Sequence, residues 1–186
     1  IDGLADNQVV GAVAAADGTM WFATFRGASR WDGRRFENFT TAHGLAGNDI
    51  RAIHQDRAGY IWFGTSSGLS RWDGKRFERY TTSQGLVNNW VYRICEDTAG
   101  ALWFASGGGL FRWDGRRFHK FTTPTGEAVE IVNTLWPASD GIVWVGFGVG
   151  GVARIAGTNF TRYTPATGVA LSYAICGMED GDGVTW

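Results

Sequence analysis

The chain has 186 residues, of which 44% are hydrophobic and 28 are glycine, and its formal net charge is -1. The hydrophobic content excludes an intrinsically disordered protein, and the balanced charge gives no basis for binding nucleic acid or another polyanion. No apolar run approaches the roughly 18 residues of a membrane-spanning helix, so we expect no membrane span in this segment. Because the sequence begins at Ile1 without a basic and apolar leader, we expect any export signal to lie outside it.

Tryptophans recur along the chain at a fixed interval. The recurring positions are Trp21, Trp62, Trp103, Trp144 and Trp186, separated by 41, 41, 41 and 42 residues. Phenylalanine, threonine and glycine keep the same period, as in Gly44, Gly85, Gly126 and Gly168. The interval predicts four full repeats and the start of a fifth, at residues 3–43, 44–84, 85–125, 126–167 and 168–186.

The repeat that begins at Gly85 shows the predicted elements most clearly. In chain order these are Val91 to Asp97, Leu102 to Ala105, Leu110 to Trp113 and Phe118 to Phe121. Short runs of aromatic and β-branched residues divided by Gly and Asp turns are typical of antiparallel strands joined by hairpins. No sustained helical periodicity is present, so we expect a helix content near zero.

Both faces of each predicted sheet need cover. Ile61, Trp62 and Phe63 point alternately to opposite faces of a strand, yet all three are large and apolar. A four-stranded sheet that is buried on both faces and repeats every 40 to 45 residues or so is a propeller blade. The sequence therefore predicts an all-β protein: a β-propeller of four-stranded antiparallel blades, with four blades and the start of a fifth.

An arc of blades exposes an unpaired edge and an apolar face, which a closed ring covers. We therefore interpret residues 1–186 as a fragment of a larger, seven-bladed ring. Two alternatives stay open: a four-bladed ring with surplus residues, and an oligomer in which several copies share one ring.

By analogy with other propellers, the Val-x-x-Ile strand is innermost and the Phe-x-x-Phe strand is outermost. This order places the loops Thr65 to Gly68 and Thr82 to Asn89 on one rim of the central channel. The Asp-Gly hairpins, such as Asp73-Gly74, then lie on the opposite rim.

The repeat also resembles a known family. Its motifs are Glu96-Asp97-x-x-Gly100-x-Leu102-Trp103-Phe104 and Gly109-Leu110-x-Arg112-Trp113-Asp114-Gly115. They resemble the two-component regulator propeller repeat, which forms the extracytoplasmic sensor region of bacterial hybrid histidine kinases. The first repeat departs from the motif with Ala15 in place of the Asp, and the fourth has Ile155-Ala156 in place of Trp-Asp. The resemblance implies a periplasmic or extracellular sensor, anchored in a membrane and dimerised through its parent receptor.

The sequence contains little that predicts catalysis or a cofactor. His43, His54 and His119 occupy different repeat positions without metal-ligand spacing, and Cys95 and Cys176 are expected to be buried free thiols. We expect no cofactor and no metal. The recurring Arg and Asp of the Arg-Trp-Asp-Gly motif are interpreted as scaffold residues, with the Asp in a turn and the Arg stem over apolar surface.

Positions that hold a repeat scaffold recur, whereas positions that bind a single ligand need not. The ligand-binding candidates are polar and aromatic residues predicted on the rim of the inner strands. They are Phe25, Arg26, His43, Asn48, Arg51, Asn89, Trp90, Tyr92, Arg93 and Glu127. Trp90 and Tyr92 with flanking Asn and Arg suit a sugar, although Trp90 could equally seal the space between blades.

These observations predict a non-enzymatic sensor segment. It would bind an oligosaccharide, another small ligand or a neighbouring subunit, and pass the signal to a histidine kinase or similar output outside this chain. Two alternatives stay open: a propeller glycosidase or lyase that uses Glu127 or Glu130, and a scaffold for protein contacts.

Overall fold

The structure is a computed structural model that describes residues 3–129, 132–148, 150–167, 177 and 180. The chain divides into two compact units, Ile1–Ile94 (unit 1) and Cys95–Trp186 (unit 2). Gly168, Cys176 and Trp186, and with them most of the predicted start of a fifth repeat, lie outside the described residues.

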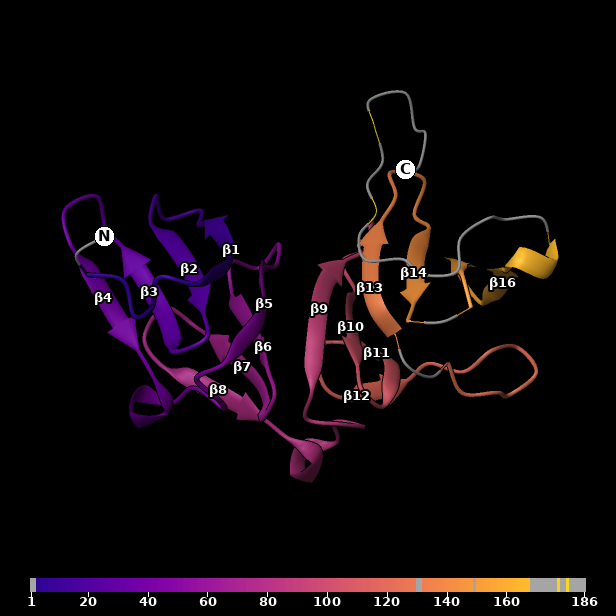
Figure 1. Cartoon of the computed structure of the whole chain (residues 1–186), viewed down its shortest axis with the longest axis horizontal. Coiled ribbons are helices and arrows are strands. Elements are labelled where there is room, and N and C mark those ends of the chain that lie inside the picture. Colours follow the sequence, from indigo (N-terminus) through magenta and orange to yellow (C-terminus); the bar gives the residue numbers. More distant parts are fainter. Residues whose placement is uncertain (1–2, 130–131, 149, 168–176, 178–179, 181–186) are drawn as a thin grey trace. The chain divides into compact units, whose positions relative to one another are not determined.

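The described residues form four antiparallel sheets, each made of four consecutive strands (Figure 1). We call these sheets blades 1 to 4. Blades 1 and 2 contain β1 Val9–Ala14, β2 Met20–Thr24, β3 Gly27–Trp31 and β4 Phe36–Phe39, then β5 Ile50–Gln55, β6 Ile61–Thr65, β7 Gly68–Trp72 and β8 Phe77–Tyr80. Blade 3 contains β9 Val91–Glu96, β10 Leu102–Ser106, β11 Gly109–Trp113 and β12 Phe118–Lys120. Blade 4 contains β13 Val132–Pro137, β14 Val143–Phe147, β15 Val152–Ala156 and β16 Asn159–Tyr163.

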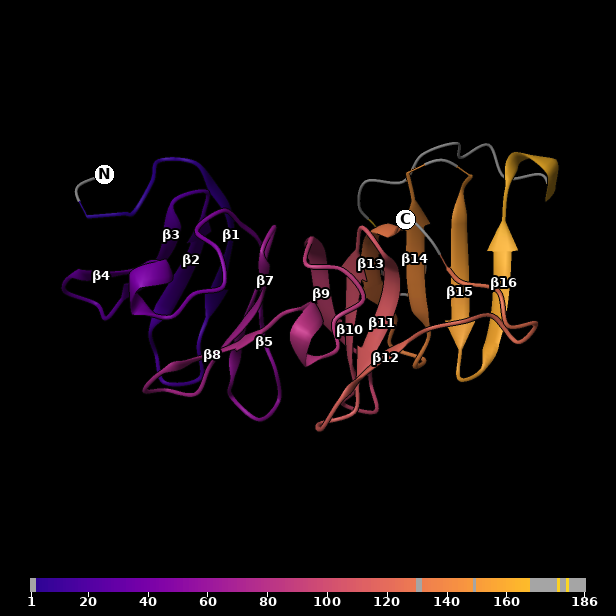
Figure 2. The same cartoon turned by 90° about the horizontal axis from the view of Figure 1, so that it is seen from below.

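The strands of a blade pair in the order in which they follow one another, and β14, β15 and β16 can be followed side by side in Figure 2. This arrangement confirms the predicted all-β fold of four-stranded antiparallel blades. The only helices among the described residues are three single 3-10 turns, η1 Thr41–His43, η2 Thr82–Gln84 and η3 Pro165–Thr167. None of these could cross a membrane. That the blades belong to a larger ring stays a prediction.

Unit 1 is held together by a cluster of aromatic rings between blades 1 and 2. The ring centroid of Trp21 lies 5.3 Å from Phe39, 5.5 Å from Phe63 and 5.6 Å from Trp72, and Phe77 completes the cluster. Trp21 and Phe63 are almost fully buried. Stacked and edge-to-face ring pairs add to the free energy gained by burial, which explains the recurrence of aromatics in both neighbouring repeats.

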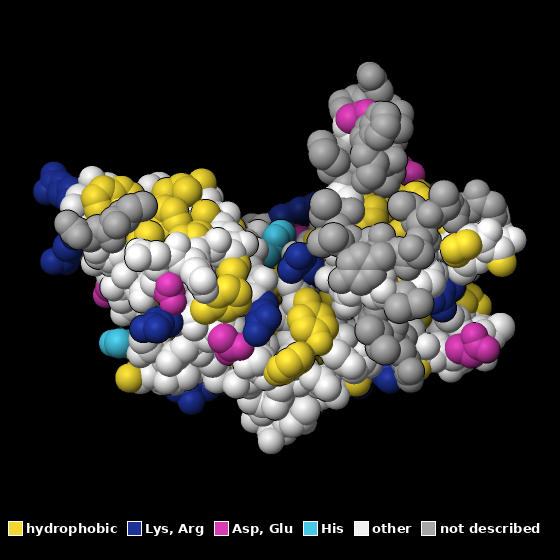
Figure 3. Space-filling model, in the orientation of Figure 1, with side chains coloured by type: hydrophobic (Ala, Val, Ile, Leu, Met, Phe, Trp, Pro, Cys, Tyr) yellow, Lys and Arg dark blue, Asp and Glu magenta, His cyan; other side chains and the backbone are white. Residues whose placement is uncertain are grey.

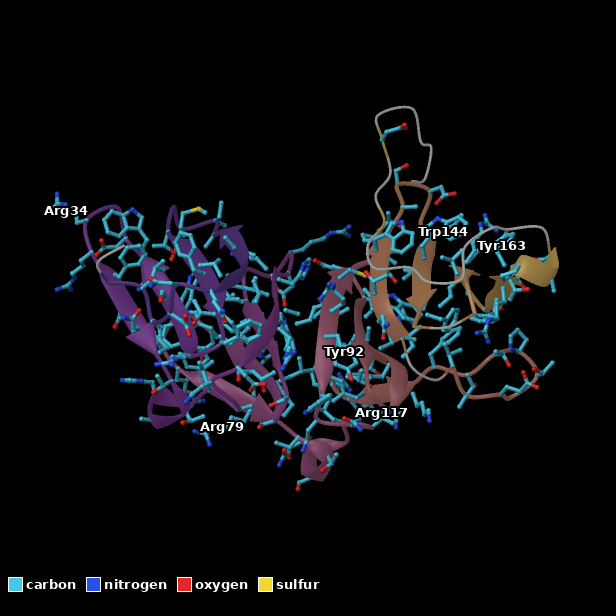
Figure 4. The ribbon with its side chains drawn as sticks, viewed as in Figure 1. Arg34, Arg79, Tyr92, Arg117, Trp144 and Tyr163 are labelled. Carbon is cyan, nitrogen blue, oxygen red and sulfur yellow. The ribbon has the colours of Figure 1, made fainter. Side chains whose placement is uncertain are left out.

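Unit 2 has a core of mixed aromatic and aliphatic residues between blades 3 and 4. Trp103, Val143, Val145 and Ile155 are buried there, and Phe121 packs against them. On the far side of blade 4, Trp144 of β14 lies near Tyr163 of β16, with 5.8 Å between their ring centroids (Figure 4). Cys95 is buried and free, as predicted, and burial raises the pKa of its thiol.

The Asp of the recurring Asp-x-x-Gly motif ties the first hairpin of a blade to its tryptophan. In blade 3, Asp97 accepts hydrogen bonds from the backbone N–H of Ala99 and Ala101 through Oδ1, and from Trp103 Nε1 through Oδ2 at 2.8 Å. Asp56 accepts from Trp62 Nε1 in the same way at 2.7 Å. The motif therefore satisfies the one polar group of a buried indole.

Blades 1 and 4 have alanine at this position, and the carboxylate that stabilises the turn comes from two residues further on. Asp17 accepts from the backbone N–H and the hydroxyl of Thr19, and Asp140 accepts from the backbone N–H of Ile142. The Thr19 hydroxyl is the main cause of the lowered pKa of Asp17. The turn survives the substitution, but the bond to the tryptophan does not form in blade 1, where Asp17 bonds Thr19 and Arg30 instead.

The Arg-Trp-Asp-Gly motif has the scaffold role predicted for it. The guanidinium groups of Arg30, Arg71 and Arg112 lie 6.0, 5.6 and 5.6 Å from the ring centroids of the tryptophans one strand away. The motif aspartates accept two backbone N–H bonds each, as Asp73 does from Lys75 and Arg76 at 2.8 Å. These bonds lower the pKa of the three carboxyl groups, which are those of Asp32, Asp73 and Asp114.

Candidate functional site

The turns between the second and third strands lie at the same end of blades 1 and 2 as the starts of the inner strands. This follows from the register, in which Val9 pairs with Thr24 and Ile50 pairs with Thr65. Both turns are fixed by a threonine: the hydroxyl of Thr65 donates to the carbonyl of Gly68 at 2.9 Å and accepts from the N–H of Ser67 at 3.0 Å. The loop residues between these anchors project from one rim, as predicted.

Arg51 on β5 is the centre of a cluster on this rim of unit 1. Its guanidinium carbon lies 5.4 Å from the ring centroid of Phe25, in the β2–β3 turn, and 5.9 Å from that of Trp90, just before β9. Both distances are within cation–π range. We call Phe25, Arg51, Trp90 and Tyr92, with Asp49 and Ser66 beside them, the Arg51 cluster.

Trp90 is the most exposed large hydrophobic side chain among the described residues, at 51%. Its ring meets that of Tyr92 edge to face at 6.1 Å, and its backbone N–H donates to Asn88 Oδ1 at 2.7 Å. Tyr92 lies on β9 (Figure 4). An indole that is held by its backbone and open to solvent presents a flat apolar surface to a ligand.

Acidic and hydroxyl groups complete the polar part of the cluster. Asp49 Oδ1 accepts from the Ser66 hydroxyl at 2.8 Å, and Asp49 Oδ2 lies 3.7 Å from the guanidinium of Arg51. Nearby in sequence, exposed Arg26 pairs with Asp6 at 3.2 Å. Figure 3 shows hydrophobic, Lys or Arg, and Asp or Glu side chains next to one another over β5. The cluster thus offers ring faces, a cation and hydrogen-bonding oxygens together.

Sequence reasoning missed Asp49 and Asp6, although a signal for Asp49 was present. Asp49 and Arg51 are two residues apart, and the equivalent positions one repeat later are Trp90 and Tyr92. Ile50 and Val91 between them are both fully buried. A buried aliphatic residue that recurs between two neighbours that vary indicates a strand whose exposed face is specialised in each repeat.

Three of the predicted candidates are used by the scaffold of the loops. Asn48 Oδ1 accepts from the N–H of Thr41 at 2.7 Å, and Asn89 Oδ1 accepts from the N–H of Thr82 at 3.0 Å. His43 Nδ1 accepts from the N–H of Thr40 at 3.1 Å in the capping box of η1. The interval of 41 residues between Asn48 and Asn89 is the sequence signal of this shared role.

The remaining candidates lie at the edge of the cluster or in the other unit. Arg93 donates from Nη1 to the carbonyl of Tyr92 at 2.8 Å. Glu127 belongs to unit 2, in the loop closed by the Thr122 to Ala128 bridge, where its N–H donates to the Thr123 hydroxyl at 3.1 Å. Glu130 lies outside the described residues. Within the described ranges, no three His, Cys, Asp or Glu side chains gather in a way that could hold a metal ion.

Two segments of the chain, residues 44–67 and 85–108, match the family described as two component regulator propeller. Each segment runs from the loop before an inner strand to the turn after the second strand. The resemblance predicted from the sequence is confirmed in these repeats. A search of curated proteins gives no match.

Solved structures with a similar fold include extracellular domains of two component and one component systems. The extracellular domain of a hybrid two component system from B. thetaiotaomicron has a TM-score of 0.79 and 18% identity, covering 95% of this chain and 26% of that one. The extracellular domain of a one component system from the same organism has a TM-score of 0.79 and 24% identity, covering 100% of this chain and 29% of that one. The chain therefore spans less than a third of the length of these domains.

Enzymes share the fold as well. Virginiamycin B lyase from Staphylococcus aureus has a TM-score of 0.73 and 15% identity, covering 96% of this chain and 62% of that one. At these identities the likeness shows the fold alone.

Proposed function

We propose that this chain, which carries two component regulator propeller repeats, is a non-enzymatic sensor segment of a bacterial signalling receptor. The Arg51 cluster binds the signal, and an output module outside this chain, such as a histidine kinase, receives it. The single observation that carries the proposal is Trp90, whose exposed ring faces the guanidinium of Arg51 on the rim predicted for ligand binding.

The location of the segment follows from the same proposal. Similar folds are extracellular domains of hybrid and one component systems, which supports a periplasmic or extracellular position. A receptor of this kind signals as a dimer through parts outside residues 1–186. The two segments that match the two component regulator propeller family contribute strands to the blades that carry the cluster.

The chemistry of the cluster favours an oligosaccharide as the ligand. The apolar face of a sugar ring stacks on indole and phenol rings such as those of Trp90 and Tyr92. Its hydroxyl groups can accept from the guanidinium of Arg51 and donate to the carboxylate of Asp49. The side chains of Arg51 and Asp49 are 42% and 31% exposed, so both are accessible to such a ligand.

Calorimetric titration of the 186-residue chain with cello-, xylo- and malto-oligosaccharides tests the binding step. We expect Trp90→Ala to weaken the binding of the recognised sugar about tenfold, because the stacking surface is lost, and Arg51→Ala to weaken it by a similar factor. Val10→Ala is the matched control, since Val10 is an exposed residue at the position of Arg51 in the first repeat. Arg34→Ala is a second control, which removes an exposed cation from the hairpin at the other end of blade 1 (Figure 4).

A reporter strain that carries the intact receptor tests the signalling step. Trp90→Ala should abolish induction by the recognised sugar, while Val10→Ala should leave it intact. Sugar binding that is indifferent to Trp90→Ala and Arg51→Ala contradicts the assignment of the site. Induction that persists in both variants contradicts the assignment of the function.

A propeller lyase or glycosidase remains the second candidate, because virginiamycin B lyase shares the fold. It predicts that the intact protein turns over a carbohydrate and that Glu127→Gln abolishes this turnover. A pure scaffold for protein contacts predicts instead that none of the sugars gives heat on titration.

A further inference from the structure

Unit 2 contains a hollow of about 600 Å³ between blades 3 and 4. Its walls are mainly apolar, and include Trp103, Phe121, Pro124, Val143 and Ile155. Two charged side chains also line it: Arg112 of β11 and Asp97, whose carboxylate accepts from Trp103. Walls of this kind suit a compact ligand with an apolar body.

The corresponding hollow in unit 1 has a similar volume of about 540 Å³ but a different lining. There, Trp72 and Asp73 of the Arg-Trp-Asp motif stand in the wall. Trp72 also covers Phe39, with 5.3 Å between their ring centroids. In blade 4 the motif reads Ile155-Ala156, and the hollow of unit 2 extends to Phe121, which holds the position of Phe39.

The arginine of this motif also has a different partner in unit 2. Arg30 and Arg71 face Glu37 and Glu78 on the neighbouring strand, and each forms an ion pair with that glutamate. Arg112 faces His119 instead. The Nε2 atom of His119 lies 2.7 Å from Asp114 Oδ2, so His119 is engaged away from the arginine.

Arg112 is therefore less neutralised and more exposed than its equivalents. Its side chain is 45% exposed, against 29% for Arg30 and 22% for Arg71. The nearest carboxylate is that of Asp97, at 3.9 Å, whose two oxygens already accept from Ala99, Ala101 and Trp103. Across the described ranges no hydrogen bond from the guanidinium of Arg112 is found, which leaves its planar set of N–H donors for a ligand.

We propose that this hollow binds a small organic carboxylate with an aromatic or branched apolar body. The carboxylate pairs with the guanidinium of Arg112, for which a bidentate pair is the strongest geometry. The apolar body lies against Trp103, Phe121 and Ile155. This site goes beyond the proposed sensor function, because it uses none of the residues of the Arg51 cluster and lies in the other unit.

Nuclear magnetic resonance of the 186-residue chain tests the proposal, with phenylacetate as the probe and neutral phenylacetamide as its isostere. The indole N–H signal of Trp103, assigned with Trp103→Phe, should shift on titration with phenylacetate, with a dissociation constant on the order of 1 mM, as for a small probe with one ion pair. Phenylacetamide should bind about tenfold more weakly because it lacks the charge.

Two variants rebuild the pattern of unit 1 in unit 2. His119→Glu places a carboxylate opposite Arg112, as in unit 1 a carboxylate faces Arg30 and Arg71. Ile155→Trp supplies a ring like the one that covers Phe39 in unit 1. Each should reduce the shift of Trp103 at least tenfold without lowering the urea midpoint of the chain. Arg116→Gln removes an exposed cation from the adjacent hairpin and should leave the shift unchanged.

Three results would overturn the proposal. One is a Trp103 signal that does not move at phenylacetate concentrations well above 1 mM. Another is an equal shift with phenylacetamide. The third is an unchanged shift of the Trp103 signal in folded His119→Glu. This variant tests the proposal even if Ile155→Trp does not fold.

Discussion

Units 1 and 2 solve the same packing problem with different chemistry. In unit 1, Trp21 is surrounded by the rings of Phe39, Phe63 and Trp72. In unit 2, the equivalent Trp103 has one ring neighbour among the described residues, Phe121 at 5.5 Å, and its indole N–H donates to Asp97. One tryptophan is held by rings and the other by a hydrogen bond.

This difference shows which repeat positions are fixed by the fold and which can change. A tryptophan recurs on the second strand of each blade, but its neighbours are exchanged between repeats without loss of the sheet. Ile155, in place of the tryptophan of the motif, lines the hollow beside Trp103, whereas Trp72 lines the hollow of unit 1. A repeat fold can therefore acquire a binding site through substitutions that its hydrogen-bonded strands tolerate.

Replacing the central tryptophans should give the largest effect. We expect Trp21→Ala to lower the free energy of unfolding by about 3–5 kcal/mol, because it empties a space that rings enclose on several sides. Trp103→Ala should lower the free energy of unfolding by less, because fewer aromatic rings pack against Trp103 than against Trp21. Urea denaturation of both variants measures the two losses. An equal loss, or a larger one for Trp103→Ala, contradicts the difference in packing.

For the turn carboxylates we expect the larger loss of stability in unit 2, at Asp97, and the smaller one in unit 1, at Asp17. Asp97→Ala leaves the Trp103 N–H and two backbone N–H groups without their acceptor. We expect it to lower the free energy of unfolding by about 2–3 kcal/mol. Asp17→Ala removes bonds only to Thr19 and Arg30, both near the surface, and should cost about 1 kcal/mol. Urea denaturation again measures both. A larger loss of stability for Asp17→Ala than for Asp97→Ala would show that the hydrogen bond between Trp103 and Asp97 adds nothing to the stability of unit 2.

Filling the hollow of unit 2 should have a smaller effect of the opposite sign. Ile155→Trp restores the residue type found at Trp72, and we expect it to raise the free energy of unfolding by roughly 1 kcal/mol, as cavity-filling substitutions commonly do. Ile155→Val is the matched control and should lower it by about 1 kcal/mol. A fall in stability with Ile155→Trp would mean that the backbone of blade 4 leaves no room for the ring.

The blades could be predicted from the sequence because their determinants are local and recur. Each Asp-Gly hairpin and each buried Trp of the second strand is repeated at an interval of 41 residues, so several copies support one assignment. Even the scaffold roles of Asn48 and Asn89 were visible in their spacing, although both also stood among the binding candidates. Gly27 shows how strict such positions are: its φ is 135°, and a Cβ there would lie 2.3 Å from the carbonyl oxygen of Phe39.

The binding sites could be predicted only in part, because they depend on residues from different repeats. The rim and the candidates Phe25, Arg51 and Trp90 were identified, but their contact requires a turn, a strand and a loop from three different repeats to converge. The hollow of unit 2 was not predicted at all. The departures at Ile155 and Ala156 were evident in the sequence, yet a hollow depends on how neighbouring side chains fill the space, which no repeat pattern specifies.

The smallest expected effect concerns the hairpin aspartates and pH. Backbone N–H groups hold the pKa of Asp73 below its usual value of 3.8, and the same groups together with His119 lower that of Asp114 further. A carboxylate whose pKa is lowered by folding stabilises the protein above its unfolded pKa, and this contribution is lost as the pH falls through the folded pKa. The charge of both residues should therefore be stabilising at neutral pH and contribute nothing in strong acid.

Asp73→Asn and Asp114→Asn keep a side-chain oxygen for the turn and remove only the charge. Each variant should be slightly less stable than the unmodified chain at pH 7, and the difference should vanish on acidification below pH 3.8. It should persist to lower pH for Asp114→Asn, since the pKa of Asp114 is lowered by His119 as well. Thermal denaturation at a series of pH values measures both differences. A difference that stays constant down to strong acid would show that the lost stability comes from the geometry of the turn rather than from its charge, and would remove this distinction between the units.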